Sequence, residues 1–234
     1  MNLNQLIEFY NDGNNYNVER LLKLSDQFML ELSLSANSIE DLFVKGNELF
    51  FPKIEITGEN NLKNTQNVIF AFNHPTTFDI FPISKLFSTY TNLKIVNRLQ
   101  NSEKYPSISA LQKKFDERFI FTHDVEKIVK TLRSNGSIVM CPLLYLDSHL
   151  TEDVIELQIG KLAKLARLNN SKIVFGKLHY DWSKIPFRNI SIEIMEALSY
   201  QDITKIRENS YHISNFNSFQ INWNNFIYIL SSML

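Results

Sequence analysis

The sequence predicts an α/β fold, in which a mostly parallel central sheet is flanked by helices. From Pro52 onward, short apolar runs rich in Ile, Val and Phe alternate with longer segments whose apolar residues recur at helical spacing. The run at 68–72 contains no polar residue, which is typical of a strand buried on both faces. Because strands separated by helices pair in parallel, this alternation favours a sheet with helices on both faces.

The first 50 residues are expected to form a helical extension (1–50). Residues 2–10 are a short helix candidate, and 18–34 carry leucines and a phenylalanine at helical spacing. A further helix is expected at 37–50, in which Gly46 is a weak break point. We expect the extension to pack on the sheet, and a cover over a binding site is the alternative.

The α/β core is expected at 52–195. Its predicted strands are 54–57, 68–72, 93–96, 118–121, 137–141, 173–178 and 190–195, and its predicted helices are 77–87, 108–115, 124–133 and 154–168. Pro82 lies early in the first of these helices and is expected to bend it, because proline has no N–H to donate.

The chain is expected to close with a C-terminal helical segment (200–234), polar at 201–208 and apolar at 219–233. The apolar part is too short to cross a bilayer. Packing on the core is preferred over a dimer contact or an interfacial membrane helix, since the segment lacks the basic face of the latter. The 234 residues are therefore expected to form one domain.

Composition narrows the class of function. The formal net charge of −1 gives no electrostatic case for nucleic acid, and a single cysteine permits no intramolecular disulfide. Residues 1–10 lack the basic start and apolar run of a signal peptide. We expect a cytoplasmic protein with at most peripheral membrane contact. The 18 phenylalanines are explained by core filling, and the alternative is that four of them line a tunnel for an apolar ligand. Those four flank the most informative motif: Phe72, Phe78, Phe81 and Phe87.

That motif follows the apolar run at 68–72 and includes His74 and Asp79. A neutral imidazole accepts a proton from an attacking hydroxyl or amine when a carboxylate holds its other nitrogen. The spacing therefore predicts a general base, His74, with its own orienting partner, Asp79. The alternative interpretation is structural: His74 satisfies a backbone group at the strand end and Asp79 caps a turn.

Other sites are not predicted. The sequence contains no Gly-x-Ser-x-Gly elbow, glycine-rich phosphate loop or His-Glu-x-x-His motif. Cys141 is interpreted as a small buried residue rather than a nucleophile. His179 and Asp181 supply only two possible metal ligands, so no metal site is predicted.

Asn73, His74, Thr76 and Asp79 together resemble the first motif of the glycerolipid acyltransferase family, of the 1-acylglycerol-phosphate acyltransferase type. Further blocks resemble the family in the same order: Phe119-Ile120, then Asn135 to Pro142, then Gly160 to Ala163, then Lys172 to Phe175. The resemblance covers about residues 52–195. It implies direct acyl transfer from a thioester, on coenzyme A or an acyl carrier protein, with no bound cofactor.

The third block departs from the family pattern. Where the family has Phe-Pro-Glu-Gly-Thr-Arg, this chain keeps Pro142 but has Leu143 and Leu146 at the charged positions, and the second block has Thr122 in place of arginine. Leucine offers no donor to a phosphate. The resemblance therefore implies a hydroxyl or amine acceptor other than glycerol phosphate. Substrate contacts are expected from Asn73, Thr76, Thr77, Phe78, Pro142 and Tyr145.

Two alternatives remain open at the level of sequence. The altered third block is compatible with a non-catalytic protein that binds acyl chains or a carrier protein. The same imidazole is also compatible with an acyl thioesterase, in which it activates water.

Overall fold

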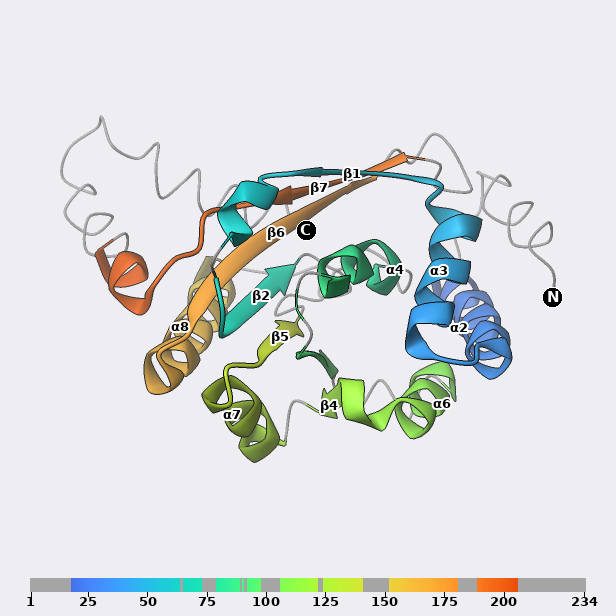
Figure 1. Ribbon diagram of the computed structural model, residues 1–234, viewed down its shortest axis with the longest axis horizontal. Coiled ribbons are helices and arrows are strands. Elements are labelled where there is room, and N and C mark those ends of the chain that lie inside the picture. The colour runs from blue at the N-terminus through green and yellow to red at the C-terminus, as the bar shows by residue number, and fades with distance from the viewer. Residues whose placement is uncertain are drawn as a thin grey trace.

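The computed structural model describes residues 18–63, 65–72, 79–88, 90, 92–97, 106–121, 124–140, 152–180 and 189–205. These residues form a seven-stranded sheet with helices on both faces (Figure 1). The predicted α/β class is thereby confirmed. The helix candidate at 2–10 and the apolar segment at 219–233 lie outside the described residues.

The strands are β1 (Lys53–Thr57), β2 (Val68–Phe72), β3 (Leu93–Asn97), β4 (Phe119–Phe121), β5 (Ser137–Met140), β6 (Lys172–Tyr180) and β7 (Asn189–Ile194). Their order across the sheet is β1-β7-β6-β2-β5-β3-β4. All neighbours are parallel except β6 and β7. Strand β2 lies at the centre, with Ile69 opposite Ile138 of β5 on one side and Ile173 of β6 on the other.

The helices are α2 (Val18–Ser35), α3 (Ile39–Phe50), α4 (Ile80–Ile83), α6 (Pro106–Lys114), α7 (Val125–Arg133) and α8 (Glu152–Asn169). Short 3₁₀ helices are η1 (Glu59–Leu62), η2 (Ser84–Ser88) and η3 (Asp116–Arg118), and residues 200–205 form a last helical segment. No helix within the described ranges has an apolar stretch long enough to cross a membrane.

Three expectations from sequence are corrected. The helix expected at 77–87 is α-helical only over Ile80–Ile83 and continues as the 3₁₀ helix η2, because the hydrogen bonding changes at Ser84. The N–H of Ser84 is shared among three carbonyls there. Arg118, expected in a strand, belongs to η3. Gly46 does not break its helix but lies in the buried face of α3.

The sheet separates two apolar layers, and β2 contributes to both. Val68, Phe70 and Phe72 point into the first layer, whereas Ile69 and Ala71 point into the second. Such alternation is the period of a strand buried on both faces, and all five residues of β2 are buried. The first layer lies under α2, α3, α4 and α6, and the second under α7 and α8 (Figure 1).

The N-terminal helices pack on the sheet, as expected. Phe28, Met29 and Leu32 of α2 and Leu42 and Phe43 of α3 belong to the first layer. They share this layer with buried residues of β2 and β3, so α2 and α3 help to cover one face of the sheet.

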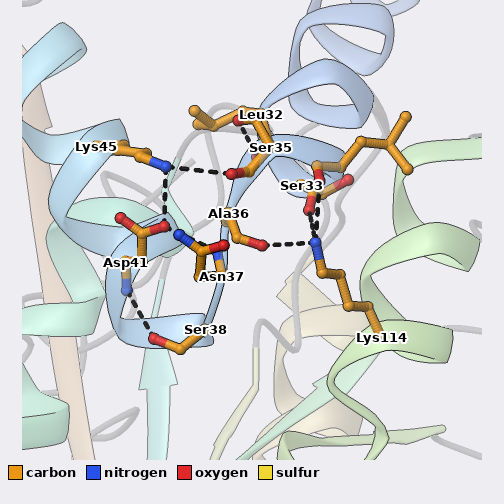
Figure 2. Close-up of polar contacts among 10 residues, drawn as sticks. Leu32, Ser33, Ser35, Ala36, Asn37, Ser38, Asp41, Lys45 and Lys114 are labelled. Atoms are coloured by element: carbon orange, nitrogen blue, oxygen red, sulfur yellow. Dashed lines mark hydrogen bonds and ion pairs between the residues drawn. The ribbon is translucent and has the colours of Figure 1, made fainter.

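Two charged side chains join α2 to α6, one near each end of α6. The buried Asp26 carboxylate accepts hydrogen bonds from the Ser107 N–H and hydroxyl at the start of α6. At the other end, the Lys114 ammonium group donates to the carbonyls of Ser33, Leu34 and Ala36 at 2.8, 3.0 and 2.5 Å (Figure 2). A carboxylate at a helix N-terminus and an ammonium group at a C-terminus both oppose the helix dipole. The two helices therefore cap each other.

Candidate functional site

The candidate site lies where the central strands β2 and β5 end. These strands are parallel neighbours, so their carboxyl ends, Phe72 and Met140, lie at the same edge of the sheet. From Phe72 the chain leads to α4 in the first layer, whereas from Met140 it leads to α8 in the second. Adjacent strands whose connections go to opposite faces define a topological switch point, where α/β proteins commonly bind ligands. The fold thus favours a ligand site between the ends of β2 and β5.

Asp79 is the predicted catalytic residue that the structure describes. It is the residue before α4, and its side chain is fully buried, at 0% exposure. Its backbone carbonyl accepts from the Ile83 N–H at 3.2 Å, but its carboxylate does not cap the helix. The backbone of Asp79 is helical, with φ −60° and ψ −22°, rather than extended as in most capping residues. The Asp79 side chain therefore does not act as the cap of α4.

Helix α4 is held in place by α3. A Cβ atom at Gly46 would overlap the Phe81 ring, so the absence of a side chain at Gly46 lets α3 approach α4 closely. The Phe81 ring stacks on Phe50, with centroids 6.0 Å apart. One residue after Gly46, the Asn47 amide donates to the Ser84 hydroxyl at 3.1 Å, and Ser84 in turn donates to the Phe81 carbonyl. These contacts fix the helix that begins immediately after Asp79.

The remaining predicted site residues lie outside the described residues. They are Asn73, His74, Thr76, Thr77 and Phe78, which follow β2, and Pro142 and Tyr145, which follow β5. Their assignments stay predictions. Cys141 and Asp181 lie outside as well.

The structure describes the side chains of two of the four phenylalanines that were considered as tunnel-lining residues. Phe72 and Phe81 are 1% and 0% exposed and belong to the first layer. The Phe72 ring lies over Gly176 of β6, where a Cβ atom would overlap it. Both rings thus fill positions that a glycine leaves open on the neighbouring element.

Sequence reasoning missed the Asn47–Ser84 contact. A signal existed, because the buried stripe of α3 includes Asn47 among apolar residues and Gly46. A polar residue in a buried stripe requires a partner, but the sequence alone does not identify one 37 positions away.

The buried contact between Tyr90 and Thr65 lies away from the candidate site. Burial raises the pKa of the Tyr90 phenol, which shares a hydrogen bond of 2.6 Å with the Thr65 hydroxyl. Thr65 and Tyr90 precede β2 and β3, at the amino edge of the sheet, opposite the candidate site. Among the residues described, no three His, Cys, Asp or Glu side chains come together as metal ligands.

No protein-family model and no curated protein matches the chain. Among solved structures, it is similar to the 1-acyl-sn-glycerophosphate (LPA) acyltransferase PlsC from Thermotoga maritima, with a TM-score of 0.48 and 13% identity. The match covers 89% of this chain and 92% of that one. Such a distant likeness does not extend the activity of PlsC to this chain.

Proposed function

We propose that this protein transfers an acyl group from a thioester to a hydroxyl or amine acceptor, with His74 as general base and Asp79 as the residue that orients it. The observation that carries the proposal is the fully buried Asp79 carboxylate, which does not cap its own helix and follows His74 by five positions. A carboxylate away from water requires hydrogen-bond donors, and the second nitrogen of an imidazole is a suitable one.

The position of this pair in the fold supports the proposal. His74 is the second residue after β2, and Asp79 immediately precedes α4. Both therefore belong to the connection that leaves the sheet beside the end of β5, at the switch point. The residues that resemble the third block follow β5, and β2 and β5 are neighbouring strands of the sheet.

In the proposed reaction the acceptor hydroxyl or amine attacks the thioester carbonyl while its proton moves to Nε2 of His74. Asp79 holds the Nδ1–H and stabilises the imidazolium that forms. The N–H groups of Thr76 and Thr77 are proposed to stabilise the oxyanion, since Pro75 has none. As the carbon–sulfur bond breaks, the imidazolium returns the proton to the leaving thiolate, so the products are an ester or amide and a free thiol.

The substrates are proposed from the sequence. The donor is an acyl-coenzyme A or an acyl carrier protein bearing a fatty-acyl chain, and no bound cofactor is required. Because Leu143, Leu146 and Thr122 stand where the resembling family has charged residues, we propose an acceptor without a glycerol-phosphate group. Asn73, Phe78, Pro142 and Tyr145 are the proposed substrate contacts.

The test is thiol release by the full-length protein with acyl-coenzyme A and acyl-carrier-protein donors, with and without acceptors from a cell extract, followed by mass spectrometry of the products. Thiol release should depend on an acceptor and should fall about 100-fold or more in His74→Ala. His212→Ala is the control, because this histidine belongs to none of the motifs identified in the sequence, and it should retain wild-type turnover.

Each alternative gives a different result in the same assay. Free fatty acid formed without any acceptor indicates a thioesterase. Thioester binding without consumption indicates a binding protein. Undiminished transfer in a folded His74→Ala variant removes the general base from the proposal.

A further inference from the structure

We propose that Asn47 is a positioning residue for the candidate site: by holding Ser84, it fixes the short helix α4 and with it the Asp79 carboxylate. This inference rests on the proposed roles of His74 and Asp79. It concerns a residue of the N-terminal helices, which the sequence suggested only as packing or as a cover.

Asn47 is a polar side chain in an apolar environment, where an asparagine is unfavourable unless it makes a specific contact. Asn47 is 8% exposed and lies in the apolar stripe of α3, between Phe43 and Phe50. Asparagine is a poor helix former in a helix interior, and a buried carbonyl oxygen without a hydrogen bond is destabilising. Within the described part of the chain, the Asn47 Oδ1 atom has no such bond. A leucine at this position would suit the stripe better.

The bond that Asn47 does make explains its presence. Its Nδ2 donates to the Ser84 hydroxyl at 3.1 Å, and that hydroxyl donates to the Phe81 carbonyl within α4. Both Asn47 and Ser84 are 8% exposed, so water does not readily replace either partner. The hydrogen bonds thus connect the middle of α3 to the end of α4.

Helix α4 depends on such an external contact. It has only four residues, Ile80–Ile83, and a single helical turn is not stable by itself. The residue that precedes this turn is Asp79, and the residue that follows it is Ser84. A rotation or shift of α4 at Ser84 therefore displaces Asp79 at the other end of the same turn.

Asn169 provides a matched comparison. It is 7% exposed and, among the described residues, is the other one whose Oδ1 is buried without a hydrogen-bond partner. Its amide donates to the Leu165 carbonyl at 2.8 Å, within its own helix α8, and its backbone carbonyl accepts from Asn67. Asn169 precedes β6 at the amino edge of the sheet, so it ends a helix remote from Asp79 along the strands.

The experiment compares Asn47→Leu with Asn169→Leu in the full-length protein. The first readout is the pKa of His74, followed by NMR of the imidazole and assigned with His74→Ala. A nearby carboxylate raises an imidazole pKa, so a displaced Asp79 should lower the pKa of His74 in Asn47→Leu and leave it unchanged in Asn169→Leu. The second readout is transfer, where kcat should fall about 10-fold or more in Asn47→Leu, with an unchanged KM for the thioester.

An unchanged His74 pKa and kcat in a folded Asn47→Leu protein would overturn the inference. If this variant does not fold, Ser84→Ala, which removes the partner hydroxyl alone, carries the same expectations and the same decision. Failure of the proposed function is a separate result. In that case the wild-type protein shows no transfer, while the His74 pKa still reports whether Asn47 positions Asp79.

Discussion

Asp79 is the residue on which the proposed chemistry depends, and its burial is complete. Asp26 is also buried, but the Ser107 hydroxyl and N–H account for it as a helix cap. Asp79 is buried more completely and does not cap α4. The two residues therefore offer a direct comparison of a carboxylate in the candidate site with a structural one.

Replacing Asp79 by asparagine should remove the negative charge that stabilises the imidazolium, with little change in side-chain volume. We expect kcat to fall about 100-fold or more in Asp79→Asn. In Asp26→Asn, we expect a lower free energy of unfolding but normal turnover of the folded protein. Steady-state kinetics and urea unfolding of both variants separate these effects. Equal turnover in the two folded variants would exclude a catalytic role for Asp79.

Glycines in two helices are expected to respond oppositely to the same substitution. In Gly46→Ala the new methyl group would overlap the Phe81 ring, which should lower the free energy of unfolding by about 1–3 kcal/mol. In Gly160→Ala, apart from the adjacent backbone of α8, no atom of the described residues lies within 4 Å of the new methyl group, so higher helix propensity should stabilise α8 by about 0.5–1 kcal/mol. Urea denaturation measures both. A stabilised Gly46→Ala protein would show that α3 need not approach α4 so closely.

At the scale of elements, α2 and α6 form a pair through Asp26 and Lys114. Lys114 accounts for three carbonyls that would otherwise lack partners at the end of α2 (Figure 2). A second lysine, Lys45 of α3, donates to the Ser35 carbonyl and to Asp41. Lysines from two different helices therefore meet the end of α2.

Replacing Lys114 by methionine should keep its aliphatic contacts and remove the charge. We expect a loss of about 1 kcal/mol in the free energy of unfolding, since the side chain is partly exposed and charged hydrogen bonds are weakened by solvent. Amide hydrogen exchange should accelerate over the last turns of α2. The neighbouring exposed Lys113 is the control, because no hydrogen bond of its ammonium group to α2 is found in the described residues. Equal exchange in Lys113→Met and Lys114→Met would contradict this role.

The sequence predicted the regular elements well because their signals are local. The five apolar residues of β2 define that strand without reference to the rest of the chain. Contacts between distant residues were not predictable in this way. Asp26 and Ser107 are 81 positions apart. The need for a glycine at position 46 depends on where the Phe81 ring lies. The helix expected at 77–87 is α-helical only over Ile80–Ile83, because the apolar spacing of so short a segment does not distinguish an α-helix from a 3₁₀ helix.

For the candidate site, the sequence identified Asp79 and its place after β2. It could not establish that the carboxylate is fully buried or that it leaves its own helix uncapped, since both depend on packing. It also did not place the end of β5 beside that of β2, because strand order is not encoded in local periodicity. The roles of His74 and the other predicted contacts stay predictions.

In the whole molecule, the switch point predicts where substrate lies. A non-reactive acyl-thioester analogue should slow amide hydrogen exchange at the carboxyl ends of β2 and β5, around Phe72 and Met140. The amino edge of the sheet, with Asn67 and Ser171, should be unaffected. Exchange measured by mass spectrometry with and without the analogue tests this. Protection confined to the amino edge would move the binding site to the opposite end of the strands.

The mutual capping of α2 and α6 has a consequence for any shortened or recombined form of the chain. A fragment beginning at β1 would retain Ser107 and Lys114 but lose the carboxylate and the carbonyls that they contact. In such a fragment the N–H groups at the start of α6 and the Lys114 ammonium group would lose their partners in α2, and the apolar surface beneath α2 would be exposed. In any shortened or recombined form of the chain, α2 should therefore be kept or exchanged only together with α6.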